Sequence, residues 1–281
     1  MVNPGKQCHD VIGDFAGADD LLWAAQSGKL TQMGGVCVAR SGRIGPLVEM
    51  LMARQSMPLA FTTVKFEAPF ASTIARAISA GRIGGTAFRS RAGVFPLRCY
   101  ADEGDGADRW ALWRSRAEQA AIAVGFPRPL AAGIIGAMGE LRENVFRHSR
   151  NADSGLAAYA ATVDGFEIVI SDAGIGVLES LHEHPDYADL ADSGAALKVA
   201  VEDGNSRLGR ASGNGFGMGQ MFRALTNHDG DLRFRSEDHA LIVRGHSPSL
   251  QGSVELAHKA RLGGLTVTVR CASPNGHLRS A

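Results

Sequence analysis

The sequence predicts an α/β protein, because segments with helical periodicity alternate with short apolar runs that are typical of strands. Residues 34–40 form such an apolar run, and residues 42–55 follow it with their apolar side chains at helical spacing. Further along the chain, two β-rich runs flank Asp164-Gly165, a dipeptide typical of a tight hairpin turn. These observations predict helices that pack against sheet.

Residues 1–94 are expected to form a small α/β module whose role the sequence does not indicate. Besides the strand and helix already named, it has further expected elements: one short helix within 14–30, a strand within 59–68, a helix beginning at a proline within 69–81, and more strand material within 84–101. An equally favoured alternative is an N-terminal extension packed onto the main domain. Glycines near positions 81–85 and 93 place the boundary within residues 85–95, and residues 95–281 are taken as the second domain.

The second domain is expected to begin with two helices and to end in antiparallel strands. Residues 107–126 place Trp110 and Trp113 along one helical side, which indicates a packed core stripe. The remaining expected elements are a helix at about 130–148, two strands within 156–174, a long connection at 178–214 with a helical segment and the composition of a mobile lid, a helix at 219–230, and strands at 231–245, 253–262 and 265–272.

The composition is typical of a soluble globular protein. Lys plus Arg and Asp plus Glu number 29 each, so charge predicts no direct nucleic-acid binding. The four cysteines lie far apart and the N-terminus lacks a signal-peptide pattern, which favours reduced thiols and a cytoplasmic location. Cys37 is interpreted as a buried small apolar residue. No apolar run approaches the ~20 residues needed to span a bilayer, so no membrane span is expected.

A first motif lies in the segment "GELRENVFRHS", where Glu140, Asn144 and His148 recur at intervals of four. Such residues share one face of a helix, which leaves Met138, Leu141 and Val145 to face a core. An amide oxygen can bind Mg²⁺, and a carboxylate can accept a proton from water or a hydroxyl. Alone, the pattern is more often an ordinary solvated helix face.

A second motif is "VISDAGIGV", residues 169–177. An apolar strand delivers Asp172 to its end, and Gly174 and Gly176 then allow a tight turn and close approach of a ligand. Asp172 could accept a hydrogen bond from an exocyclic amino group such as that of adenine. The simpler alternative is a strand followed by a common Asp-Gly turn.

A third motif is "GNGFGMGQMFRAL", residues 213–225, in which four glycines at alternate positions precede an expected helix. Exposed backbone amides and a helix N-terminus could hold phosphates. The pattern is neither a P-loop nor a Rossmann fingerprint. A flexible glycine-rich linker is the competing interpretation.

Taken in order and spacing, the three motifs resemble those of the GHKL, or Bergerat-fold, superfamily, which includes DNA gyrase, sensor histidine kinases and anti-sigma serine kinases. "ELRENVFRHS" looks like the N box, "DAGIG" like the first glycine box and "GNGFGMG" like the second. "RLGGLTVTVRC" resembles the terminal strand, although Thr266 is displaced by one residue, after Leu265. The resemblance covers residues 95–275 and is closest to stand-alone anti-sigma and sensor-kinase-like ATPase domains.

This resemblance implies a two-layer α/β sandwich, with a mixed sheet on one side and helices on the other, that binds ATP and Mg²⁺. It implies that Asn144 binds Mg²⁺, that Glu140 is the catalytic base and that Asp172 binds adenine. The glycines then shape the adenine pocket or contact the phosphates: Gly174, Gly176, Gly215, Gly217 and Gly219. For His148 two roles stay open, a contact near the nucleotide and capping of its own helix.

Two functions follow from the resemblance. The first is a Mg-ATP-dependent enzyme in bacterial-type signalling, either an ATPase or a protein kinase, that acts on a partner protein. The second is a catalytically weak module whose lid orders around ATP and changes the surface offered to a partner. The oligomeric state stays open, with a homodimer among the candidates.

Overall fold

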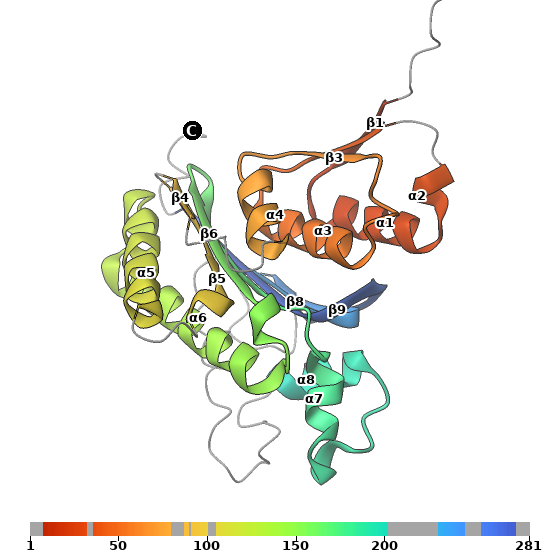
Figure 1. The fold of residues 1–281 in the computed structure, drawn as a ribbon. Helices are drawn as coiled ribbons and strands as arrows, with labels where there is room; N and C mark the ends of the chain where they lie inside the picture. The colour runs from red at the N-terminus through yellow and green to blue at the C-terminus, as the bar shows by residue number, and fades with distance from the viewer. Residues whose placement is uncertain are drawn as a thin grey trace, which may run out of the picture.

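The computed structural model describes residues 8–32, 36–79, 87–89, 91–100, 105–201, 230–244 and 254–273. The described chain is α/β, as expected, and its helices and sheets form four layers (Figure 1). A helical layer covers one face of a six-stranded sheet, a second helical layer covers the other face, and a small three-stranded sheet lies outermost. The six-stranded sheet therefore lies between two sets of helices.

The outer sheet belongs to the N-terminal segment and is parallel, in the order β1-β2-β3. Its strands alternate with helices in the chain: β1 (Cys8–Ile12), α1 (Phe15–Gln26), α2 (Lys29–Gln32), β2 (Val36–Arg40), α3 (Ile44–Ser56), β3 (Val64–Glu67) and α4 (Ala71–Ser79). The side chain of Asp14 caps α1 by accepting a hydrogen bond from the amide of Gly17. The expected helices and strands are present here, although the helix expected to begin at a proline begins at Ala71, and β1 and α2 were not foreseen.

The six-stranded sheet has the order β4-β5-β6-β7-β9-β8, and all five neighbouring pairs are antiparallel. The expectation of a mixed sheet is therefore wrong. Its strands are β4 (Ala87–Arg89), β5 (Ala92–Pro96), β6 (Leu156–Thr162), β7 (Gly165–Ser171), β8 (Gly230–Arg244) and β9 (Val254–Ala272). The hairpin expected at Asp164-Gly165 joins β6 to β7.

Strand β9 is one continuous strand, although the sequence predicted two strands on either side of Gly263-Gly264. The two glycines form an irregularity rather than a break: the pairing with β8 moves from Ser236–Leu265 to Glu237–Leu262. Gly264 adopts a φ of +81°, which favours glycine. The strand continues past this bulge because β8 stays paired to it.

The helical layer on one face of the six-stranded sheet consists of α5 (Gly106–Ala123) and α6 (Arg128–His148). Trp113 of α5 is fully buried, and its ring stacks on Trp110 at 5.0 Å between centroids. Phe95 of β5 and Tyr159 of β6 contact the same ring edge-on. The expected core stripe is thus confirmed, and it packs α5 against the sheet.

The opposite face of the six-stranded sheet is covered by α1, α3 and α4 of the N-terminal segment, so helices lie on both faces and not on one. Val48 and Met50 of α3 share a buried apolar cluster with Ala158, Val169 and Leu262 of the sheet. The N-terminal segment therefore has a sheet of its own and also packs onto the rest of the chain.

The expected boundary between residues 94 and 95 falls inside β5. Ala87 already belongs to the six-stranded sheet through β4, and Val94 pairs with both neighbours of β5. The sheet of the second unit thus takes its first strands from residues before that boundary, within the glycine-containing region 85–95.

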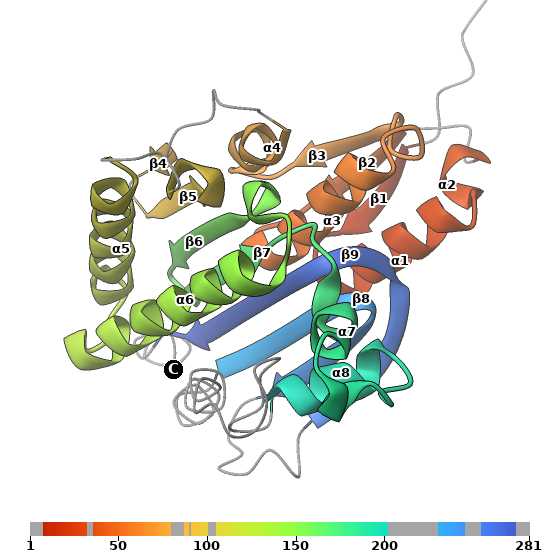
Figure 2. The ribbon, with the colours of Figure 1, turned by 60° about the horizontal axis from the view of Figure 1, so that its bottom comes forward.

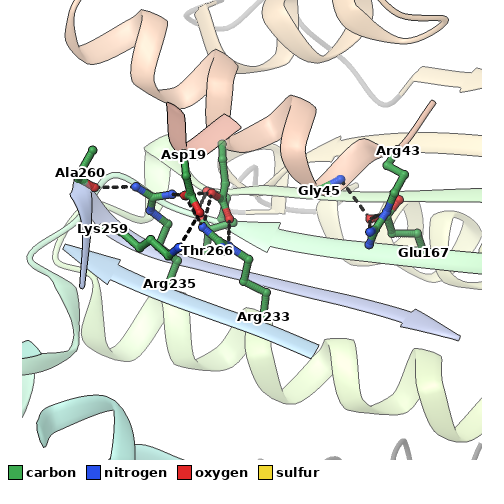
Figure 3. Close-up of polar contacts among 11 residues, drawn as sticks. Asp19, Arg43, Gly45, Glu167, Arg233, Arg235, Lys259, Ala260 and Thr266 are labelled. Carbon is green, nitrogen blue, oxygen red and sulfur yellow. Dashed lines mark hydrogen bonds and ion pairs between the residues drawn. The ribbon is translucent and has the colours of Figure 1, made fainter. Parts of the chain in front are cut away.

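Ion pairs between buried residues join the two units (Figure 3). Asp19 of α1 and Glu49 of α3 lie against Arg233 and Arg235 of β8, and all four side chains are at most 8% exposed. Lys259 of β9 adds a contact of 2.9 Å to Asp19. Burial by itself would raise the pKa of Asp19, but Arg233, Lys259 and Arg235 together lower it below its ordinary value.

A second polar contact between the units lies further along the sheet. Glu167 of β7 is buried, and its carboxylate accepts hydrogen bonds from the backbone amides of Ile44 and Gly45 and from the Arg43 guanidinium (Figure 3). A strand side chain therefore caps the N-terminus of α3, where unpaired amides favour a carboxylate.

The connection after β7 holds more structure than expected. Two helices, α7 (Gly176–His182) and α8 (Ser193–Val201), pack against β8 and β9 (Figure 2). Only α8 was expected. Short 3-10 turns complete the described chain: η1 (Leu97–Tyr100), η2 (Ala152–Ser154) and η3 (Pro185–Tyr187). Of the helix expected at 219–230, residues 219–229 lie outside the described residues, as do residues 202–214 of the expected lid.

Two single expectations can be compared with the described chain. Cys37 is buried, as interpreted, and so is Cys271. Burial raises the pKa of Cys271 to about 12, which keeps the thiol protonated near neutral pH. Among the helices that the structure describes, none combines the length and apolarity required to cross a bilayer.

Candidate functional site

Helix α6 carries the first motif as predicted. Pro129 lies in its first turn, where a missing amide hydrogen costs nothing, and Met138, Leu141 and Val145 are buried against the core. The motif residues lie away from that core: Glu140 is exposed and Asn144 is half-buried. The helix therefore presents an acid and an amide, one turn apart, on a face that is open to solvent.

The second motif begins where β7 ends. Asp172 is 2% exposed, and its Oδ1 accepts a hydrogen bond of 2.8 Å from the amide of Gly174. Its own amide donates to the carbonyl oxygen of Leu265 on β9. Burial raises the pKa of Asp172 to about 6, while the backbone hydrogen bonds of Gly174 and Leu265 act in the opposite direction. A buried carboxyl group with one accepted amide hydrogen bond can accept further donors.

The end of α6 and the loop after Asp172 are in direct contact. The amide of Ile175 donates to the carbonyl oxygen of Ser149, and a β-carbon at Gly174 would overlap that same oxygen. His148 Nδ1 lies 3.3 Å from the hydroxyl of Ser180 on α7. His148 therefore links α6 to α7, while the C-cap position belongs to Ser149. The structure thus brings the first two motifs together.

Gly176 begins α7 with a φ of +77°, a conformation that side chains rarely adopt. The next amide, that of Val177, donates to Ser236 Oγ at 2.9 Å. Ser236 in turn donates its hydroxyl hydrogen to the carbonyl oxygen of Gly264 at 3.0 Å. One buried serine on β8 therefore holds both the start of α7 and the bulge of β9.

Thr266, which the resemblance places one residue out of register, is buried directly beside the Asp172 strand. Its hydroxyl lies 2.7 Å from that of Ser171, the residue that pairs with it across β7 and β9. The sequence patterns did not single out Ser171, Ser236 or Gly264. For Ser171 the available signal was its place directly before Asp172, and for Gly264 it was the Gly263-Gly264 pair.

The third motif, with Gly215, Gly217 and Gly219, lies outside the described residues. Within the described part of the chain, no three His, Cys, Asp or Glu side chains form a group suited to hold a metal ion. Asn144 is the candidate metal ligand there, and its amide oxygen is a donor that Mg²⁺ accepts.

Comparison of the chain with protein-family models found no match, and comparison with curated proteins and with solved structures found none either.

Proposed function

We propose that the chain binds Mg-ATP as a member of the GHKL superfamily and hydrolyses it or transfers its γ-phosphoryl group to a partner protein. The observation that carries the proposal is the hydrogen bond from the amide of Ile175 to the carbonyl oxygen of Ser149. Ser149 ends α6, the helix that bears Glu140 and Asn144, and Ile175 lies in the loop after the buried Asp172. The six-stranded sheet with α5 and α6 on one face supports a Bergerat-type arrangement.

Asp172 is the proposed adenine ligand. The buried carboxylate of Asp172 accepts a hydrogen bond from the amide of Gly174 and has the capacity to accept more, and an exocyclic amino group supplies a suitable donor. Above about pH 6 this group is ionised and can only accept hydrogen bonds. Gly174 shapes the adjoining loop because a β-carbon there would overlap the carbonyl oxygen of Ser149, and Gly176 does so through its φ of +77°, which side chains disfavour.

Asn144 and Glu140 extend this site along α6. They precede His148 by one and two helical turns, so their α-carbons lie roughly 6 and 12 Å from that of His148 along the helix axis. In this arrangement Asn144 offers its amide oxygen to Mg²⁺, and Glu140 accepts a proton from water or from a protein hydroxyl. Mg²⁺ would offset the negative charge of the phosphates and take its other ligands from them and from water.

The glycines at 215, 217 and 219 are the proposed phosphate contacts, and the partner protein is the proposed phosphoryl acceptor in bacterial-type signalling. The glycine assignments come from the resemblance of "GNGFGMG" to the second glycine box. Backbone amides of closely spaced glycines can approach phosphate oxygens without steric hindrance.

The test is Mg-dependent ATP binding by calorimetry, together with phosphate release, for wild type and for Asn144→Ala and Asp172→Ala. We expect Asp172→Ala to weaken binding at least tenfold with or without metal. Asn144→Ala should remove the Mg²⁺ dependence. Asp153→Ala, an exposed carboxylate on η2, is the control. Equal ATP affinity in all four proteins would contradict the proposed site.

A further inference from the structure

Strand β8 connects the N-terminal segment to the candidate nucleotide site through two adjacent residues that point to opposite faces. Arg235 points toward α1 and α3, where it contacts Asp19 and Glu49 at 2.7 Å each. Ser236, the next residue, points the other way and binds the amide of Val177 on α7. Side chains alternate across a strand, so the placement of Arg235 fixes the placement of Ser236.

A second connection runs parallel to the first and starts at the end of α1. The Gln26 side chain donates to the carbonyl oxygen of Arg261 on β9 at 2.5 Å and accepts from the amide of the same residue at 3.0 Å. Gln26 thus pairs with β9 as a neighbouring strand would. The guanidinium of Arg261 contacts Glu237, whose other oxygen accepts the amide of Gly264 at 3.2 Å.

Glu237 adopts a φ of +51°, a left-handed conformation that is unfavourable for residues with a side chain. Its contacts to Arg261 and Gly264 hold it there. Both connections therefore end at the same place, the bulge formed by Ser236, Glu237 and Gly264.

That bulge touches the nucleotide loop directly. A β-carbon at Gly264 would overlap the carbonyl oxygen of Asp172, and the next residue, Leu265, accepts the Asp172 amide. A shift of the bulge must therefore move Asp172, the start of α7, or both. Packed elements of this kind transmit displacement because there is no free volume to absorb it.

We propose that Ser236 and Glu237 are positioning residues for the nucleotide site, and that α1 sets their position, so that ATP affinity depends on docking of the N-terminal segment. This regulation rests on the proposed ATP-binding function. If α1 moved away while α3 stayed in place, Arg233 and Arg235 would remain buried without the carboxylate of Asp19. Such a partly docked state is unfavourable because a buried charge without its partner is costly. The two arrangements, docked and undocked, are then distinct states that a ligand of the N-terminal segment can bias.

The test uses the full chain and the variant Gln26→Ala, which removes an exposed side chain. The control is Glu67→Gln, which removes an exposed contact to Arg40 within the three-stranded sheet and does not touch β8 or β9. We expect Gln26→Ala to weaken Mg-ATP binding about three- to tenfold and Glu67→Gln to leave it unchanged. Ser236→Ala should also weaken binding, and the double variant should weaken it by less than the product of the two single effects.

Hydrogen exchange of the nucleotide-free protein gives a second readout that does not require ATP. The amides of residues 172–177 should exchange faster in Gln26→Ala and in Ser236→Ala than in wild type or Glu67→Gln. If Ser236→Ala does not fold, Glu237→Gln replaces it, since this change weakens the contact to Arg261. Unchanged exchange at 172–177 in Gln26→Ala would overturn the inference. Absence of ATP binding in wild type would instead refute the proposed function, and hydrogen exchange would then still test whether α1 positions residues 172–177.

Discussion

Gly174 lies so close to the carbonyl oxygen of Ser149 that no side chain fits between the nucleotide loop and the end of α6. The same oxygen accepts the amide of Ile175, so the loop is both hydrogen-bonded and packed against the helix. Glycine at this position therefore maintains the contact between the first two sequence motifs.

The first prediction is that Gly174→Ala destabilises the protein by about 1–3 kcal/mol, because the new methyl group must displace backbone. The free energy of unfolding in urea measures this. Gly136→Ala is the matched control: an added β-carbon there meets no atom within 4 Å, and the position lies inside α6. This control should stabilise the protein by about 0.5–1 kcal/mol. Equal effects of both changes would contradict the close packing.

A second prediction concerns pH. The folded-state pKa of Asp172 is raised from 3.8 to about 6, so the folded protein binds more protons than the unfolded chain between these values. The free energy of unfolding should therefore fall as the pH rises from about 4 to 6, by up to about 3 kcal/mol for this group. Asp172→Asn stays neutral and removes this contribution.

The difference in stability between Asp172→Asn and wild type, measured by urea unfolding at several pH values, isolates the group from all others. The free energy of unfolding of Asp172→Asn should rise relative to that of wild type as the pH rises from 4 to 6, and the difference should stay constant at higher pH. A difference that does not change with pH would show that Asp172 has an ordinary pKa in the folded state.

A third prediction addresses the buried ion pairs. Glu49 is fully buried and contacts both Arg233 and Arg235, so Glu49→Gln leaves two buried guanidinium groups with one carboxylate. We expect a loss of about 3–5 kcal/mol in the free energy of unfolding. Glu67→Gln, which removes a solvent-exposed partner of Arg40, should cause no measurable loss. A small effect of Glu49→Gln would mean that water reaches the cluster.

A fourth prediction distinguishes an enzyme from an ATP-gated interaction module. If Glu140 is the base, Glu140→Gln should lower the rate of ATP turnover about 10²- to 10⁴-fold and leave ATP affinity unchanged. Glu118→Gln on α5 is the control, since Glu118 lies outside the proposed site and forms an ion pair with Arg128 at 3.5 Å. Unchanged turnover in Glu140→Gln would refute Glu140 as the base. Wild-type turnover that is too slow to measure, while ATP still promotes partner binding, would favour the interaction module.

Helices were the elements best predicted from the sequence. The periodicity of α5 and α6 repeats every three or four residues, so their buried faces, with Trp113 and Met138, could be assigned from neighbouring positions alone. The hairpin at Asp164-Gly165 was also predictable, because its turn signal lies in adjacent residues. By contrast, the sequence predicted a break at Gly263-Gly264, where the strand continues because a distant partner, β8, stays paired through the bulge.

The sheet and its surroundings were less predictable because pairing partners lie far apart in the chain. Strand β7 pairs with β9 across about a hundred residues, and no local pattern indicates that this pairing is antiparallel. The coverage of the second face by α1, α3 and α4 depends equally on contacts between distant segments.

The sequence by itself determined the local features: which residues form α6, which of its faces carries Glu140 and Asn144, and that Asp172 ends a strand. These depend on periodicity and turn chemistry within a few residues. The tertiary structure alone decided that Arg233 meets Glu49, 184 residues away in the chain, and that Ser236 holds the start of α7. From the sequence, the alternating arginines of β8 are typical of a solvated strand face. They are buried because α1 and α3 cover that face, and the strand's own sequence does not indicate this packing.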